Sequence, residues 1–148
     1  MTTGSHSLKA PETKEEWQAY HDIRRKVLFE NRGAFNVYDE NHPDEFKTGH
    51  YPLVLIVDGE VDGVIRVDID DARVAIFRRV AIRQELQRRG HGRILLSLAE
   101  RFASAKGCDS IQSFVDKDAV GFYEKCGFAK HDSAPWSSKS VWMSRKLA

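Results

Sequence analysis

A change of hydrophobic period near the middle of the chain constrains the fold more than any other feature. Between residues 53 and 82 the apolar residues alternate or run together as they do in strands. From Ile94 to Ala103 they instead recur with the 3.6-residue period of a helix that ends at Gly107, and strand material returns at Ile111–Val115. A strand, a helix and a strand in this order form a crossover unit, so we expect its two strands to be parallel.

The strand-forming region before this helix predicts a three-stranded antiparallel meander. Its strands are expected at Leu53–Val57, Val61–Val67 and Ala72–Ile82. Asp58-Gly59 is a strong hairpin signal between the first two, and Gly63 marks a bulge inside the second.

Further elements are indicated on both sides of this core. Thr13 and Glu16 have the spacing of a capping box, which predicts a helix over about residues 14–29. A short helix is expected at Ala119–Cys126, and further strands at Ser7–Ala10, Phe128–His131 and Val141–Lys146. The long polar stretch Asn31–His50 reads either as a substrate-facing loop or as a disordered excursion. Together these elements predict an α/β (α+β) domain with a mixed sheet of about six or seven strands flanked by helices.

Size and composition narrow the class of protein. A chain of 148 residues is the size of one domain, and its net charge of +1 argues against a non-specific binder of nucleic acid. We expect no membrane partner, because no apolar run approaches ~18–20 residues. The N-terminus does not resemble a secretory signal, so we expect a cytoplasmic protein with reduced Cys108 and Cys126. The six histidines show no pair at ligand spacing, so no metal is expected.

The segment Gln87–Arg93 has the composition of an anion cradle. It lies between the end of a strand and the start of the long helix, where backbone N–H groups lack partners and the helix dipole is positive. Glycines allow close approach of an anion, and Arg88, Arg89 and Arg93 add positive charge. Neither a P-loop nor a complete dinucleotide fingerprint is present, since Leu95 replaces the third glycine of the latter. A helix start that merely required a tight turn is the alternative.

Two motifs together resemble a known family. Arg79-Val80-Ala81-Ile82, four residues, Gln-x-x-Gly-x-Gly and then Ile94-Leu95-Leu96 resemble the acyl-CoA-binding signature of the GNAT superfamily of N-acetyltransferases. The stretch from Ala119 to Phe128, with its tyrosine and Gly-Phe, is similar to that family's second recognisable stretch. The resemblance implies one GNAT-like acetyltransferase domain over residues 1–148, with the crossover carrying the CoA site.

The resemblance also implies residue roles. The backbones of Val80 and Ile82 would bond the pantetheine arm of acetyl-CoA and polarise its thioester carbonyl. Tyr123 matches the general acid that protonates the departing CoA thiolate, although it could simply pack beside Phe122. The cofactor-binding loop comprises Gln87, Arg88, Arg89, Gly90, His91, Gly92 and Arg93, with the amides from Arg88 onward holding the pyrophosphate.

The chain departs from the family pattern in three places. Asp116 stands where an asparagine usually contacts the cofactor, and it is available instead to cap the following helix. Arg78 falls close to where many members place a carboxylate base, and no acidic residue lies between Ala72 and Arg83. Cys126 replaces a usual leucine, which is expected to change only packing.

The general base is therefore unassigned. Glu30, Asp68 and His50 are candidates, each of which can equally be a solvated polar residue. Arg24, Arg78 and Arg79 could offer positive charge to an acceptor that carries a carboxylate as well as an amine. The alternative is that at least two of these three arginines are surface residues or ion-paired.

The function implied is transfer of an acetyl group from acetyl-CoA to a primary amine by direct attack, most simply a small-molecule amine. A non-catalytic acyl-CoA-binding sensor is the alternative from another class. Binding of nucleic acid through the arginines between residues 78 and 93 is disfavoured because no aromatic residues interleave with them. A homodimer is conceivable through Trp136 and Trp142, which could equally belong to the core.

Overall fold

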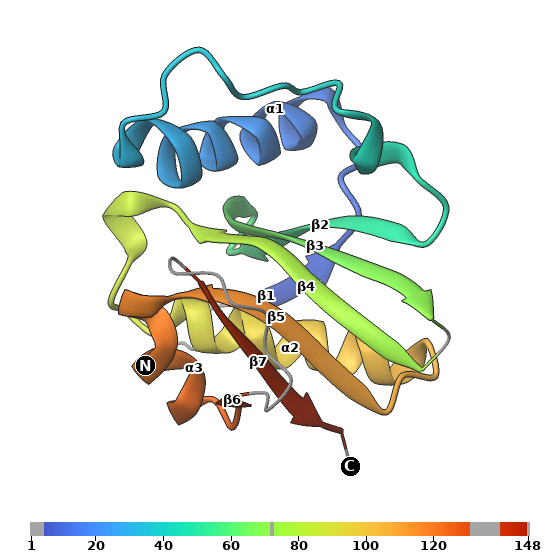
Figure 1. The fold of residues 1–148 in the computed structure, drawn as a ribbon. Helices are drawn as coiled ribbons and strands as arrows, with labels where there is room; N and C mark the ends of the chain where they lie inside the picture. The colour runs from blue at the N-terminus through green and yellow to red at the C-terminus, as the bar shows by residue number, and fades with distance from the viewer. Residues whose placement is uncertain (1–4, 72, 131–139, 148) are drawn as a thin grey trace.

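The computed structural model describes residues 5–71, 73–130 and 140–147 and shows one mixed sheet between two layers of helices (Figure 1). The strand order is β1-β2-β3-β4-β5-β7-β6. The strands are β1 (His6–Lys9), β2 (His50–Val57), β3 (Glu60–Asp71), β4 (Val74–Ile82), β5 (Ser110–Asp116), β6 (Ala129–Lys130) and β7 (Ser140–Lys146). The helices are α1 (Lys14–Ile23), α2 (His91–Ala105) and α3 (Val120–Lys125). The predicted mixed sheet of six or seven strands is confirmed.

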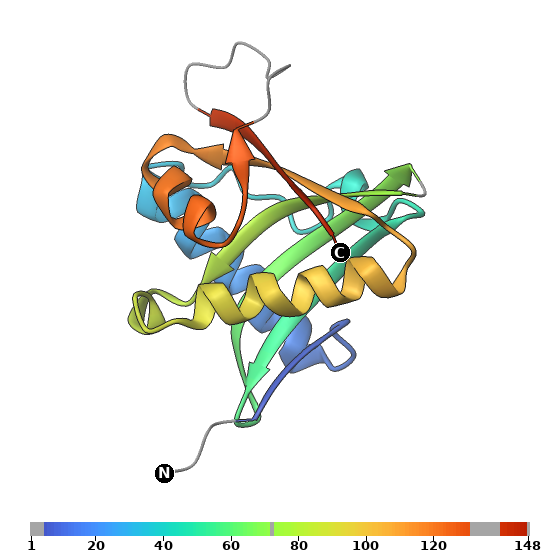
Figure 2. The same ribbon diagram turned by 90° about the horizontal axis from the view of Figure 1, so that it is seen from below.

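The sheet is buried on both faces. Helix α1 covers one face, whereas α2 and α3 pack on the other, as the two views of the ribbon show (Figures 1 and 2). Leu53 and Leu55 of β2 belong to the core beneath α2, while Val54 between them packs with Tyr20 of α1. This two-sided burial explains why the strand is a continuous apolar run rather than an alternating one.

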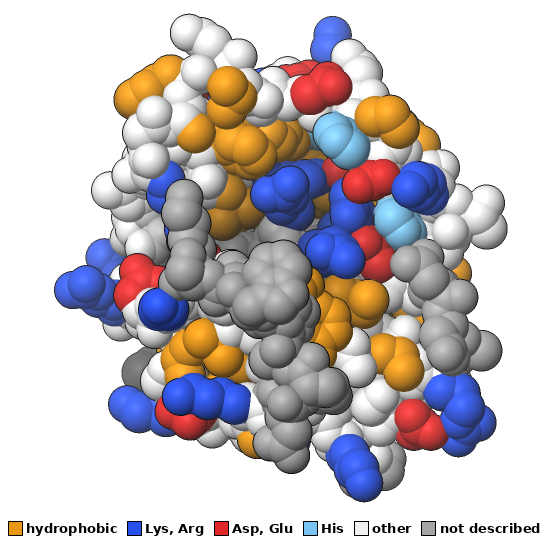
Figure 3. Space-filling view, viewed as in Figure 1, with side chains coloured by type: hydrophobic (Ala, Val, Ile, Leu, Met, Phe, Trp, Pro, Cys, Tyr) orange, Lys and Arg blue, Asp and Glu red, His pale blue; other side chains and the backbone are white. Residues whose placement is uncertain are grey.

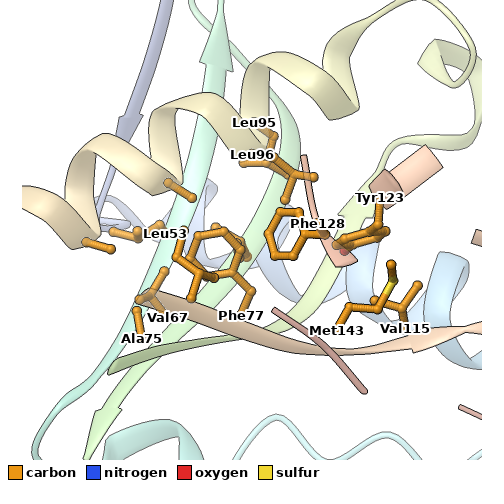
Figure 4. Packing of buried hydrophobic residues seen from close by; sticks show 14 of the residues in the cluster. Leu53, Val67, Ala75, Phe77, Leu95, Leu96, Val115, Tyr123, Phe128 and Met143 are labelled. Carbon is orange, nitrogen blue, oxygen red and sulfur yellow. The ribbon is translucent and has the colours of Figure 1, made fainter. Parts of the chain in front are cut away.

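The larger of the two cores lies between the sheet and α2 (Figure 4). Leu95 and Leu96 of α2 are almost fully buried against it, together with Phe77 of β4. Tyr123 and Phe128 extend this core under α3, where their rings meet edge to face with centroids 5.3 Å apart. The helix that begins at the predicted cradle is thereby fixed to the sheet along its apolar stripe.

The central strands β4 and β5 are parallel, as the crossover predicts, but they pair over only part of their length. Among the described residues their pairing ends at Phe77 and Ser113, although β4 continues to Ile82 and β5 to Asp116. A bulge in β4 accompanies this separation, because three steps along β4 from Arg78 oppose only two steps along β3. Arg79 in the bulge has φ 56°, a left-handed conformation that is rare for a residue with a side chain.

Local signals also specify the connections. The hairpin between β2 and β3 turns through Asp58 and Gly59, both with positive φ, and the capping box at Thr13 and Glu16 is formed. Beyond Ile23 the helix continues as π-helical turns over Arg24–Phe29, where the Glu30 amide donates to the Arg25 carbonyl. The predicted helix over residues 14–29 is thus confirmed in extent but changes its winding.

The long stretch after this helix contains only single turns of 3-10 helix, Glu30–Arg32 and Pro43–Phe46. Strand β4 begins at Val74, two residues later than predicted. Trp136 and the segment around it lie outside the described residues. None of the helices in the described part of the chain is long and apolar enough to cross a membrane.

Candidate active site

The separated ends of β4 and β5 enclose a cavity of about 360 Å³, called here the strand cavity. Val80 and Ile82 line it from β4, Phe114 and Val115 from β5, and Tyr123 from α3. Past Phe77 the edge of β4 that faces β5 no longer pairs with it, so its backbone groups are available to a ligand. This is where the family resemblance described above implies the pantetheine arm and the thioester.

The start of α2 has the geometry of an anion cradle. Gly90 is its N-cap with φ 88°, and the first turn is closed by a bond from the Ile94 amide to the Gly90 carbonyl at 3.2 Å. The preceding amides of this turn have no intrahelical partner and lie at the positive end of the helix dipole. A Cβ atom placed on Gly90 would meet nothing within 4 Å, so the backbone here borders open space, as the predicted anion cradle requires.

The other predicted loop residues play different parts. Gly92 lines the strand cavity, and a Cβ atom there would lie 3.1 Å from Phe122, so this position requires close approach between α2 and α3. The Gln87 side chain donates to the Ile82 carbonyl at 3.0 Å and so ties the loop to β4. Arg93 lines a separate surface cavity beside Glu100, so its side chain points away from the strand cavity. Arg88 has a left-handed backbone conformation with φ 65°. The buried Nδ1 atom of His91 has no hydrogen-bond partner among the described residues.

The structure therefore divides the predicted cofactor set. The residues that line the strand cavity are Val80, Ile82 and Gly92, and those that do not are Gln87, Arg88, Arg89, Gly90, His91 and Arg93. The residues of the second group lie around the start of α2, at one end of the cavity. They can contribute to binding of a ligand there through their backbone amides.

Tyr123 faces the strand cavity from the core side and is only 7 % exposed. Burial raises the pKa of its phenol to about 12, so the group is a neutral proton donor at pH 7. It is hydrogen-bonded to the Ser113 side chain, whose hydroxyl donates to the Phe77 carbonyl at 3.1 Å. The ring also meets that of Phe122 edge to face, as the packing interpretation of Tyr123 expects.

A second and larger cavity, of about 600 Å³, adjoins the first and is called here the arginine cavity. The two cavities share Phe77, Arg79 and Phe114, so they meet where β4 and β5 part. Cationic, acidic and histidine side chains gather in this hollow beside an apolar area (Figure 3). Of the residues singled out in the sequence, Arg24, His50, Asp68, Arg78 and Arg79 line it and Glu30 does not.

Asp68 and His50 are not solvated, which corrects one of the two interpretations of these candidate bases. Asp68 is 2 % exposed, and its carboxylate accepts from Arg66 at 2.7 and 2.9 Å and lies 3.0 Å from Nε of Arg78. Nδ1 of His50 lies 2.5 Å from the Asp44 carbonyl oxygen and 3.6 Å from the Asp68 carboxylate. Asp68 is thus engaged by the guanidinium groups of Arg66 and Arg78, and His50 by the Asp44 backbone.

A buried ion-pair network, which sequence reasoning missed, supports the wall of the arginine cavity. Glu45 accepts from the Tyr20 hydroxyl at 2.5 Å and from Arg24, and lies 3.9 Å from Arg66. The only sequence signal was that Arg66 and Asp68 alternate with the apolar Ile65, Val67 and Ile69 in β3. Arg24 and Arg78 are thus ion-paired, which agrees with the alternative that at least two of the three arginines are surface residues or ion-paired. Arg79 is not paired with any described carboxylate.

The capping role suggested for Asp116 is wrong. Its carboxylate accepts from Arg32 across the strand cavity, and no side-chain cap bond to the next helix is formed. Cys126 packs against the larger core, and neither cysteine forms a disulfide in the described part of the chain. Within the described ranges no group of three or more His, Cys, Asp or Glu side chains is placed to hold a metal ion.

Comparison with known proteins places this architecture in a family. The model of the acetyltransferase (GNAT) family matches residues 11–128. A Bacillus subtilis (strain 168) protein assigned by name to the acetyltransferases is 25 % identical over 132 residues, covering 82 % of each chain.

Solved structures give the same fold. A Lactobacillus plantarum protein assigned as an N-acetyltransferase superposes with a TM-score of 0.80 at 23 % identity, over 99 % of this chain and 100 % of that one. An aminoglycoside 6'-N-acetyltransferase complexed with coenzyme A superposes with a TM-score of 0.81 at 12 % identity, over 97 % of both chains. The family match covers most of the chain and both cavities, which confirms the prediction of an acetyl-CoA-dependent N-acetyltransferase. The chain belongs to the acetyltransferase (GNAT) family.

Proposed function

We propose that this chain transfers the acetyl group of acetyl-CoA to a primary amine by direct attack. The observation that carries the proposal is the junction of the two cavities at Phe77, Arg79 and Phe114. One cavity leads to an anion cradle at the start of α2, and the other is open to an acceptor. A donor and an acceptor bound in them would meet where β4 and β5 separate, as a direct transfer requires.

The cradle and β4 would hold the donor. The amides from Arg88 to Arg93 are proposed to bind the pyrophosphate, with the open backbone at Gly90 allowing close approach. Beyond Phe77, the backbone N–H groups of β4 at Val80 and Ile82 are proposed to bond the pantetheine arm and polarise the thioester carbonyl. Gln87 supports this arrangement by anchoring the loop to Ile82.

In the transfer, the neutral amine nitrogen attacks the thioester carbonyl carbon, so that a C–N bond forms and the C–S bond breaks. Tyr123 is proposed to donate its proton to the departing sulfur, a role that suits a phenol kept neutral by burial. The acceptor must lose its ammonium proton first, and we assign no side chain to that step because Asp68 and His50 are committed to other partners. Neither cysteine lines the two cavities, which supports transfer without a covalent enzyme intermediate.

The proposal extends to the setting of the protein. We propose a single acetyltransferase domain over residues 1–148, located in the cytoplasm, that acts on a small-molecule amine and uses no metal. A homodimer remains a prediction, since Trp136 lies outside the described residues and Trp142 stacks edge to face on Phe114 within one chain.

One observation favours the alternative of a non-catalytic sensor. Asp68 and His50, the candidate bases that line the arginine cavity, are both bonded to other groups. Turnover separates the two functions. The assay incubates the protein with acetyl-CoA and a panel of primary amines and measures release of free CoA thiol. We expect thiol release that depends on the amine, and in Tyr123→Phe a fall in kcat of about 100-fold with unchanged affinity for acetyl-CoA. Binding of acetyl-CoA without thiol release for any amine would instead identify a sensor.

A further inference from the structure

The arginine cavity carries more positive than negative charge at its inner wall. Four guanidinium groups gather there, and among the side chains that the structure describes only two buried carboxylates face them. The cations are Arg24, Arg66, Arg78 and Arg79, and the anions are Asp68 and Glu45. The acidic residues at the rim do not reverse this balance, because Asp44 is paired with Lys47 at 3.0 Å and Asp39 is exposed.

Three of the four arginines are ion-paired with these carboxylates. Arg66 and Arg78 share Asp68, and Arg24 is bonded to Glu45. Arg79 differs, since no carboxylate of the described residues lies within ion-pair distance of its guanidinium group. Its guanidinium group lies over the face of the Phe29 ring, whose centroid is 5.4 Å from the guanidinium carbon.

Arg79 is placed where its charge can act on a bound ligand. It lies in the bulge of β4 with φ 56°, and its side chain lines both cavities. Although part of the side chain is exposed, burial and the nearby charges of Arg24, Arg66 and Arg78 lower its pKa. Like charges therefore crowd the group, and an anion bound beside it would relieve their repulsion.

We propose that the acceptor is an amine that also carries a carboxylate, and that Arg79 binds this carboxylate at the junction of the two cavities. This proposal rests on the proposed function and names its acceptor class. A guanidinium group matches a carboxylate with two parallel hydrogen bonds, which would orient the acceptor as well as attract it. The same charge disfavours polycationic acceptors such as the aminoglycosides named for one structural relative, so the site discriminates by repulsion too.

The test compares amino acids with their own amides, which keep the α-amine and lose only the negative charge. Binding of each member of the pair is measured calorimetrically in the presence of saturating CoA, and turnover by thiol release with acetyl-CoA. For at least one of the twenty common amino acids we expect the acid to bind about 10- to 100-fold more tightly than its amide. In Arg79→Gln this ratio should fall to near one, whereas Arg79→Lys should keep part of it.

Arg101→Gln is the matched control, because it removes an exposed arginine of α2 that lines neither cavity. It should keep the full preference for the acid. No preference for any acid over its amide, or a preference that survives Arg79→Gln, would overturn the inference. A wild-type protein that binds acetyl-CoA and acetylates amines without that preference loses this inference and keeps the proposed function, whereas one that does not bind acetyl-CoA loses the proposed function itself. If Arg79→Gln does not fold, the wild-type preference and Arg79→Lys still decide the question.

Discussion

Replacement of Glu45 by glutamine tests the buried charge network that supports the arginine cavity. The side chain is 4 % exposed and joins Tyr20 and Arg24 of the first helix to Arg66 of β3. Removing one partner of a buried ion pair leaves the other charge uncompensated, at a cost of roughly 3–5 kcal/mol. With an unfolding entropy of about 2.1 cal/mol/K per residue, a chain of 148 residues should then lose about 10–16 °C in Tm.

The effect should also depend on pH. Burial by itself raises the pKa of Glu45, but the hydrogen bond from Tyr20 and the charge of Arg24 outweigh it, so the pKa in the folded protein is lowered. A lowered pKa means that the carboxylate contributes stability above its unfolded pKa of about 4.3 and loses it as pH falls through the folded value. The difference in Tm between wild type and Glu45→Gln should therefore be full at pH 7 and shrink below about pH 4.

Glu40→Gln provides the control, because Glu40 pairs with Arg25 near the surface and is 42 % exposed. Such pairs contribute less than about 1 kcal/mol, which corresponds to a few degrees at most. Thermal unfolding followed by circular dichroism measures both variants. A loss of Tm in Glu45→Gln no greater than in Glu40→Gln would refute the network as a source of stability.

Two further substitutions test other parts of the structure. Ser113→Ala removes the partner of the Tyr123 hydroxyl and should lower kcat by several-fold in the wild-type background, yet have no further effect on kcat when Tyr123 is already phenylalanine. Additive effects in that double-mutant cycle would exclude a positioning role for Ser113. Gly49→Ala should destabilise the fold more than Gly33→Ala in urea unfolding. Both glycines have positive φ, worth about 1–2 kcal/mol, but only the Cβ at Gly49 would lie 2.7 Å from a backbone oxygen, that of Ile69. Equal losses would show that this contact relaxes freely.

Most of the architecture followed from short-range patterns. The hairpin at Asp58-Gly59 and the capping box at Thr13 depend on residues next to one another, so their chemistry is visible in the sequence. The parallel pairing of β4 and β5 followed from the order of strand, helix and strand, because a crossover admits one geometry.

The charge network was not predictable in the same way. Glu45 meets Arg24 and Arg66 only because a long irregular loop folds back over the sheet. On the face of β3 that packs toward α1, the apolar Val64 gives way to Arg66 and then Asp68. From the sequence alone a carboxylate in a strand is expected to be solvated, because the contacts of Asp68 with Arg66 and Arg78 exist only in the folded sheet.

The π-helical turns after Ile23 could not be predicted from the sequence pattern either. The apolar spacing through Val27 and Leu28 fits a helix of period 3.6, and no glycine or proline interrupts it. The bulge at Arg79 likewise contains no glycine, the residue type from which a positive φ could have been predicted. Both irregularities occur beside the two cavities, where tertiary contacts rather than local propensity determine the backbone.

The most direct test of the central claim is calorimetric titration of the purified protein with acetyl-CoA, together with Gly90→Glu. That substitution places a side chain and a negative charge in the open space before the first turn of α2. Gly107→Glu is its control, since Gly107 follows the other end of the same helix, also has positive φ and also faces open space. The cradle predicts saturable binding by the wild type and by Gly107→Glu that is lost in Gly90→Glu. Absence of binding by the folded wild type, or undiminished binding by Gly90→Glu, would contradict it.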